Sequence, residues 1–320
     1  MLRSHHLTRV CVVVLVIATL GWLKVSADEK RAAPPQFSDK DLETVFFDKL
    51  TDAFRGERPS LSKVRKAAAA TNVAADTAPA AGSNGGAAEG GNLWTKLITP
   101  VSLEDEVKRV KLHYDGVITT PSAFNSGGYQ DARLDLTILA TMFAVISEHE
   151  GDVRWKSSAA AARDILARTA FRCSSGSTQV YNEAKTRKAD LQDLVSGSGL
   201  SGPASSEAND WSVVADRSPM MEYLDELKES LKGATNSEST VKDDPATARR
   251  NAELIAVVGE VLIQEGLDDA DDKDYVAFSK VMTSAASDVT RAIELGDYDA
   301  VRKAVGAVTQ SCDTCHDQYR

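Results

Sequence analysis

Apolar residues recur every three or four positions along the chain from Trp94 onward, which is the period of an α-helix. Between residues 132 and 150 they cover a wider arc than the roughly 100° of a surface helix, so this helix is expected to be largely buried. A period-two alternation, which would indicate a half-buried strand, is not sustained anywhere in the sequence. The pattern therefore predicts an all-α fold, with further helices over 157–172, 178–196, 219–232, 246–265, 274–295 and 298–318.

The residues before Trp94 follow different patterns. Residues 28–66 predict a short helical element, because apolar side chains recur at helical spacing until Gly56 and Pro59 end the pattern. Residues 67–92 are mainly Ala, Gly, Ser, Asn and Thr, which bury too little apolar surface to offset the entropy lost on ordering, so we expect a disordered linker. After it, the sequence predicts a helical domain over 93–200 and a second one over 201–320.

Residues 1–27 have the layout of a secretory signal peptide. The basic residues Arg3 and Arg9 precede an apolar run from Val10 to Leu23, and small residues around Ala27 suit a signal peptidase. The alternative is an uncleaved anchor, but the run of about 14 residues is shorter than the ~20 that a spanning helix needs. We therefore expect a periplasmic protein that is cleaved near Ala27 and has no membrane span afterwards.

The net charge of the chain narrows the classes of molecule that it can bind. The chain has 320 residues, and removal of the signal leaves 34 basic and 47 acidic side chains, a net charge of −13. An acidic surface repels nucleic-acid phosphates and favours partner proteins with basic docking faces. The cysteines that remain, Cys173, Cys312 and Cys315, are too few for a disulfide scaffold. No Ser or Cys nucleophile has an evident His partner, so we do not expect an enzyme.

The last nine residues contain the motif C-x-x-C-H, formed by Cys312, Cys315 and His316. On one helical turn, two thiols three residues apart can reach the vinyl groups on one edge of a haem, and the adjacent imidazole can supply an axial nitrogen. Export agrees with this interpretation, because covalent haem attachment normally takes place outside the cytoplasm. The motif therefore predicts one covalently bound haem c.

Three other interpretations of the motif are weaker. A thioredoxin-like redox site would follow a strand in a βαβ unit, and the pattern predicts no strand. A structural zinc site would need a second pair of Cys or His ligands, which the chain lacks. A chance occurrence is the third alternative, since the motif is short.

The C-terminal third resembles the class II c-type cytochromes, the cytochrome c′ and c-556 group. The resemblance rests on the C-terminal C-x-x-C-H with an aromatic and a basic residue, Tyr319 and Arg320, and covers about residues 207–320. It implies a four-helix bundle with the haem near the end of the last helix. Residues 28–200 lie outside it and are similar to the long N-terminal extensions of exported single-haem bacterial cytochromes.

The resemblance also implies a residue on the distal face of the iron. An Arg precedes that position by four residues in the family, and Arg217 followed by Met221 matches the arrangement. The first and fourth helices of an up-down-up-down bundle are antiparallel, so Met221 and His316 are expected at similar heights. Periodicity places Met220 in the core, and Met142 is expected farther along its helix. A gap-filling role for all three methionines is the plain alternative.

Other polar residues carry weaker expectations. Arg320 and Arg302 could pair with haem propionates, because a guanidinium matches carboxylate geometry. His149 is expected to be a surface cation at a helix C-terminus, and His113 has no placed partner. Cys173 is expected to be a buried thiol, with an intersubunit disulfide, and hence a homodimer, as the alternative.

Three functions compete on this evidence. The leading one is an electron carrier, in which the haem iron cycles between ferric and ferrous states. The second is a five-coordinate haem protein that binds NO or CO, as the cytochrome c′ branch implies. The third is a helical interaction protein with an accessory haem. Residues 139–151 and 254–266 also share a loose pattern, which fits either a duplication or two buried helices with similar ends.

Overall fold

The computed structural model describes residues 92–200 and 208–319. The predicted signal peptide, the helical element at 28–66 and nearly all of the linker at 67–92 lie outside the described residues, as does Arg320. The described residues belong to one compact unit, Gly82–Arg320.

The described part of the chain contains helices and no strand, which confirms the all-α prediction. None of its helices is long and apolar enough to cross a membrane. The bounds are α4 (Leu93–Leu97), α5 (Pro100–Val117), α6 (Pro121–Ala123), the π-helical turn η1 (Phe124–Gly128), α7 (Tyr129–Glu148), the 3-10 turn η2 (Lys156–Ser158), α8 (Ala159–Arg172), α9 (Thr178–Ser196), α10 (Trp211–Val214), α11 (Arg217–Ala234), α12 (Glu238–Asp243), α13 (Pro245–Val261), α14 (Lys273–Leu295) and α15 (Tyr298–His316).

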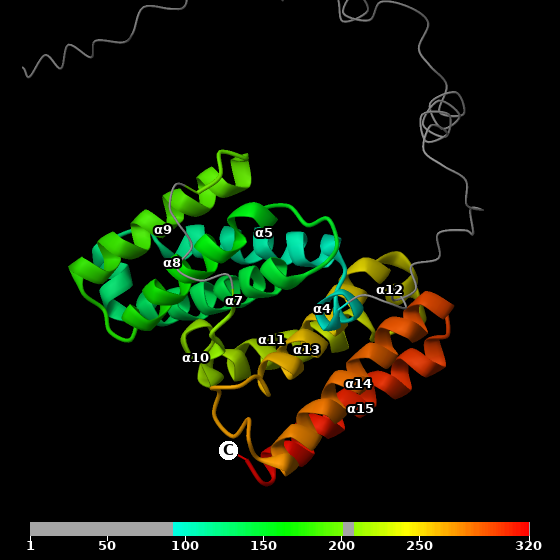
Figure 1. Cartoon of the computed structure of the whole chain (residues 1–320). Helices are drawn as coiled ribbons and strands as arrows, with labels where there is room; N and C mark the ends of the chain where they lie inside the picture. Colours follow the sequence, from blue (N-terminus) through cyan, green and yellow to red (C-terminus); the bar gives the residue numbers. More distant parts are fainter. Residues whose placement is uncertain (1–91, 201–207, 320) are drawn as a thin grey trace, which may run out of the picture. The chain divides into compact units, whose positions relative to one another are not determined.

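The C-terminal helices form a four-helix bundle (Figure 1). Helix α11 packs on α13, α13 on α14 and α14 on α15, and α15 returns to contact α11. Apolar positions of each helix face the shared core, among them Leu227, Val258, Val289 and Val308. This arrangement confirms the bundle that the resemblance implies.

The preceding helices repeat the same order of packing. Helix α5 packs on α7, α7 on α8 and α8 on α9, and α9 returns to α5 (Figure 1). The second helices of the two sets, α7 and α13, carry the longest buried runs. The two similar segments, 139–151 and 254–266, begin within α7 and α13 and extend just past their ends. The structure therefore places these segments equivalently in two sets of four helices, as a duplication would.

The two sets pack together through their first and second helices. Helix α7 contacts α11, and α5 contacts α13. The hydroxyl of Tyr223 donates a hydrogen bond to Glu106 Oε1 at 2.7 Å, and both residues are buried. The Thr99 hydroxyl likewise donates to Glu253 Oε2 at 3.1 Å. The first bond fixes α11 against α5, and the second fixes α13 against the N-cap of α5.

Helix α11 begins earlier than the sequence predicted. Its N-cap is Asp216, whose side chain accepts from the backbone N–H of Ser218, so Arg217 is the first helical residue. The predicted helix over 219–232, with Pro219 as its first residue, therefore starts two residues too late. Pro219 is the third residue of the helix, where the missing N–H has no intrahelical partner to lose.

Helix α13 approaches α14 closely at Gly259. A Cβ added to Gly259 would lie 2.5 Å from Thr283 Oγ1 and 3.0 Å from Met282 Cε. The hydroxyl of Ser279 on α14 donates to the carbonyl of Gly259 at 3.0 Å, across the same contact. Only a residue without a side chain fits this approach unless α14 shifts.

Candidate cofactor site

The motif residues lie in the last turn of α15. Helix α15 begins at the N-cap Asp297, which accepts from the backbone N–H of Ala300, and ends at His316. Cys312 and Cys315 are half-buried against the core, both as free thiols, whereas His316 is exposed. Burial raises the pKa of both thiols above the usual range, so they remain protonated at neutral pH. The motif thus places two thiols on the core-facing side of the helix end and an imidazole on its solvent-exposed side.

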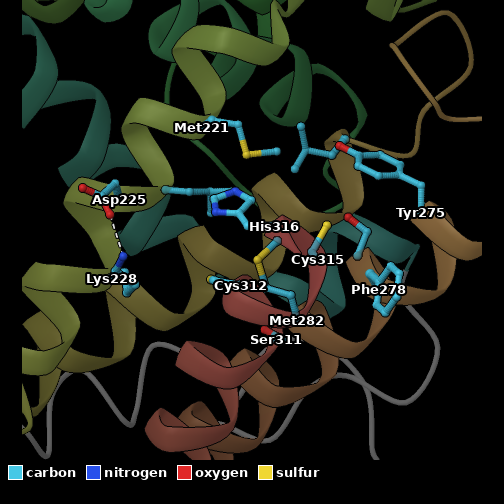
Figure 2. A pocket seen from close by; sticks show the side chains of 13 residues that line it. Met221, Asp225, Lys228, Tyr275, Phe278, Met282, Ser311, Cys312, Cys315 and His316 are labelled. Atoms are coloured by element: carbon cyan, nitrogen blue, oxygen red, sulfur yellow. Dashed lines mark hydrogen bonds and ion pairs between the residues drawn. The ribbon is translucent and has the colours of Figure 1, made fainter. Parts of the chain in front are cut away.

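A cavity opens directly beside this turn. Its walls come from helices α11, α14 and α15 of the C-terminal bundle and from Leu262, the residue after α13, and its space, including the open mouth, is about 520 Å³. The apolar part of the lining consists of Met221 and Leu224 from α11, Leu262, and Tyr275, Phe278 and Met282 from α14. Figure 2 shows Cys312, Cys315 and His316 facing this space from α15.

Most polar groups of the lining already have partners. Asp225 and Lys228 pair with each other at the edge of the cavity (Figure 2). This hydrogen bond lowers the pKa of Asp225 and raises that of Lys228, so both remain charged at neutral pH. The hydroxyls of Ser279 and Ser311 donate to backbone carbonyls at 3.0 and 2.7 Å. The interior of the cavity is therefore chiefly apolar.

The three methionines considered as iron ligands lie at different positions relative to the cavity. Met221 lines the cavity, half-buried, at the start of α11 and on the level of the end of α15. Met220 is fully buried, with its sulfur 3.9 Å from the Thr141 hydroxyl of α7. Met142 is fully buried within α7 and does not line the cavity. Among these residues, Met221 alone is brought together with the Cys312–His316 turn.

Three lining residues of α14 were missed by the sequence interpretation. Tyr275, Phe278 and Met282 follow one another at intervals of three and four, so they form one face of the helix. The same spacing is visible in the sequence, and the predicted antiparallel bundle would have turned this face toward α15. The signal was present, but it was not used in the sequence-based prediction.

The remaining candidates lie away from the cavity or differ from expectation. Arg302 is exposed and pairs with Asp299 at 3.2 Å in the first turn of α15, at the far end from the motif. His149 is fully buried, which corrects the expectation of a surface cation: its Nε2 is 3.0 Å from the carbonyl oxygen of Ile98, and its Nδ1 accepts from the backbone N–H of Gly151. Cys173 is fully buried, and burial raises its pKa to about 12.

His113 has a partner that the sequence did not place. Its Nδ1 lies 2.9 Å from the carboxylate of Asp135, which is buried on α7. Burial raises the pKa of Asp135 to about 7 despite the attraction of His113. The pair joins α5 to α7 and lies outside the cavity lining.

The donor set and the lining together fit a c-type haem. Two free thiols three residues apart can form thioether bonds to one edge of a porphyrin, and the neighbouring imidazole can reach its iron. An apolar cavity open at the same turn can cover a macrocycle. Among the described residues, no group of three or more His, Cys, Asp or Glu side chains forms a metal cluster.

One protein family matches the part of the chain that forms this site. Residues 270–320 match the family model described as Cytochrome C'. The match covers α14 and α15, which supply the aromatic wall and the C-x-x-C-H turn, and it confirms the resemblance to class II cytochromes for this segment. It implies a haem cofactor there. No curated protein and no solved structure matches the chain.

Proposed function

We propose that this chain is an exported monohaem c-type cytochrome that transfers electrons through one covalent haem in its C-terminal bundle. One observation carries the proposal. The C-x-x-C-H turn of α15 lies at the mouth of a chiefly apolar cavity lined by α11, α14, α15 and Leu262, within the segment that matches the Cytochrome C' model.

Different residues of the site would hold different parts of the haem. Cys312 and Cys315 anchor it covalently at the wall of the cavity, and His316 supplies an axial nitrogen from the next position. When bound, the haem supplies reversible one-electron chemistry at its iron. Leu224, Leu262 and the aromatic residues of α14 exclude water, and a low-dielectric environment disfavours the form that carries more charge.

Met221 would bind the iron of the haem through its thioether sulfur. Its thioether lines the cavity from α11, opposite the wall that α15 provides (Figure 2). A thioether on the iron favours the ferrous state, raises the reduction potential and blocks external ligands. These are properties of an electron carrier.

The second candidate function is the binding of NO or CO. Met221 is only half-buried and has a flexible side chain, and no hydrogen bond of its sulfur is seen among the described residues. A side chain held so loosely can leave the sixth position open, and the matching family model is that of cytochrome c′. In this case the iron would be five-coordinate.

Export and partner choice follow from the sequence. The signal-like residues 1–27 support transport across the inner membrane and cleavage near Ala27. The acidic mature chain supports electron exchange with periplasmic proteins that have basic docking faces. A homodimer would have to associate without a Cys173 disulfide, because that thiol is fully buried.

Optical spectra of the ferric and ferrous holoprotein test these functions. We expect haem that resists acid–acetone extraction, and a ferric low-spin spectrum with a weak far-red sulfur-to-iron band. A ferric high-spin spectrum with immediate CO uptake by the ferrous form would favour the gas-binding candidate. Complete extraction of the haem would contradict both.

A further inference from the structure

The hydroxyl of Tyr275 is a buried polar group without a partner at the cavity. Tyr275 is 1% exposed, lies in the first turn of α14 and lines the cavity. Within residues 92–200 and 208–319, no atom forms a hydrogen bond with its Oη. Leaving a buried hydroxyl unpaired costs on the order of 1–3 kcal/mol, so such groups in native proteins generally have a partner or a function.

The Tyr275 ring is held in one position, so the hydroxyl cannot turn away to find a partner. The Arg217 guanidinium lies over the ring, 4.9 Å from its centroid, and itself pairs with Asp269. The ring of Tyr319 packs edge-on at 5.2 Å. Figure 2 shows the hydroxyl pointing from α14 into the cavity, toward Met221.

Apart from the C-x-x-C-H residues, which would hold the haem, no other described side chain that lines the cavity offers a free hydroxyl or amine donor. Asp225 and Lys228 pair with each other, and the two serine hydroxyls donate to backbone carbonyls. Burial raises the pKa of Tyr275 to about 12, so its hydroxyl keeps its proton at neutral pH and can donate. The cavity therefore presents one fixed neutral donor among apolar groups.

One neutral donor suits a neutral acceptor better than a charged one. A carboxylate, such as a haem propionate, needs several donors or a free cation when it is buried, and the cation in the lining, Lys228, is already paired with Asp225 at the edge of the cavity. A small neutral molecule with one acceptor atom makes no such demand. We propose that the Tyr275 hydroxyl donates a hydrogen bond to a neutral diatomic ligand, such as CO or NO, held at the haem iron on the side of the cavity that Met221 lines.

This inference rests on the proposed haem site and adds a determinant of ligand choice to it. A site that is built to donate a hydrogen bond discriminates against ligands that cannot accept one, because its donor then stays unpaired. Met221 and an external ligand compete for the same side of the iron, and Tyr275 stabilises the external ligand. Tyr275 thus acts on the balance between the two candidate functions.

The test uses carbon monoxide as the probe and compares two holoproteins, Met221→Leu and Met221→Leu with Tyr275→Phe. The leucine opens the sixth position in both, and phenylalanine keeps the stacked ring while it removes the hydroxyl. We expect the C–O stretching band of the ferrous carbonyl at lower frequency when Tyr275 is present. We also expect that band to shift in D₂O with Tyr275 and not with Phe, and CO to dissociate about two to ten times faster from the Phe variant, the effect of one ordinary hydrogen bond.

Tyr319→Phe in the Met221→Leu background is the matched control. It removes a hydroxyl from the neighbouring ring, which does not line the cavity, so the carbonyl band should not move. An identical band and dissociation rate with and without the Tyr275 hydroxyl, in protein that does hold covalent haem, would overturn this inference and leave the proposed function intact. Protein that matures without covalent haem would defeat the proposed function, and the inference with it.

Discussion

Cys312, Cys315 and His316 illustrate how much chemistry one helical turn can carry. All three lie within five consecutive residues, and the helix geometry alone orients them toward one edge of a ligand. The turn by itself does not provide a cover that would shield a bound group from solvent. The aromatic side chains of α14 and Met221 of α11 provide it from other parts of the chain.

The proposed attachment points are the two thiols, which leads to the first residue-level prediction. Changing both Cys312 and Cys315 to Ala should remove all haem that survives acid–acetone extraction, because no thioether can then form. Haem staining of a denaturing gel measures this directly. Cys173→Ala is the matched control, since its thiol is fully buried away from the cavity, and it should retain the stain. A stained band from the double variant would contradict the assignment.

Met221→Leu tests the second axial ligand. Leucine keeps the apolar volume, so the free energy of unfolding should fall by less than about 1.5 kcal/mol. Without the sulfur, the ferric iron should become high-spin and the ferrous iron should bind CO readily, which absorption spectra will report. Met220→Leu and Met142→Leu are controls, because both residues are fully buried and neither lines the cavity. A spin change in a control instead would assign the ligand to another methionine.

At the scale of elements, buried polar contacts fix the helices that surround the site. Tyr223 lies two residues after Met221 on α11, and its hydroxyl bonds Glu106 of α5 inside the core. Asp135 of α7 and His113 of α5 form a second cross-helix contact. Both contacts place titratable or polar groups in the interior, where an unpaired partner would be costly.

Asp135 makes the stability of the helices dependent on pH. Its pKa is raised by burial from 3.8 to about 7, so the folded state binds a proton that the unfolded state has lost in this window. The free energy of unfolding should therefore decrease as the pH rises from about 4 to about 7, by up to about 4 kcal/mol relative to Asp135→Asn. Urea titrations of both proteins across this range measure the difference. A difference that increases with pH would mean that the His113 contact stabilises the carboxylate more than burial opposes it.

The sequence predicted some of these elements well and others poorly, for physical reasons. Helix α9 was placed exactly and α15 within two residues, because their apolar stripes end at clear breaks. Helix α5 was not delimited, because its buried face includes the charged residues Glu106 and Lys111. The cap of α11 was misplaced because Pro219 resembles a helix start, and the burial of His149 depends on the distant carbonyl of Ile98.

The site shows the same division between local and distant information. The C-x-x-C-H turn is contiguous, so the sequence located it without knowledge of packing. Met221 was placed through the family resemblance and through the antiparallel arrangement of the first and last helices, and the structure brings it to the same cavity. The unpaired hydroxyl of Tyr275 depends on the contacts of Arg217 and Tyr319, which no local pattern reveals.

At the scale of the whole molecule, charge has a definite place relative to the cavity. The acidic residues Asp268, Asp271 and Asp274 are exposed around the start of α14, directly before the cavity residue Tyr275. Their carboxylates stand near the part of the protein through which an electron would leave. A basic partner would thus be attracted to the surface closest to the haem.

Electron exchange with a cationic partner should slow as salt is added, since the Debye length falls from about 30 Å at 0.01 M to about 10 Å at 0.1 M. Changing Asp268, Asp271 and Asp274 to Asn should reduce both the rate at low salt and its dependence on salt. Stopped-flow rates at several ionic strengths measure this effect.

The matched control changes the exposed residues Asp152, Asp193 and Asp243, which lie elsewhere in the described chain, to Asn. This triple variant has the same net charge but keeps the carboxylates near the cavity. Equal losses in both triple variants would show that total charge, and not its location, governs the encounter.

The contact at Gly259 gives this protein a simple means of adjusting the capacity of its pocket. Because a Cβ there would meet Met282 at 3.0 Å and Thr283 at 2.5 Å, one added methyl group would push the tip of Met282, which lines the cavity, out of its place. A substitution in α13, at its contact with α14, would thus change the space on the cavity side of α14. A substitution at position 259, natural or engineered, could therefore change the size of the cavity without altering any residue that lines it.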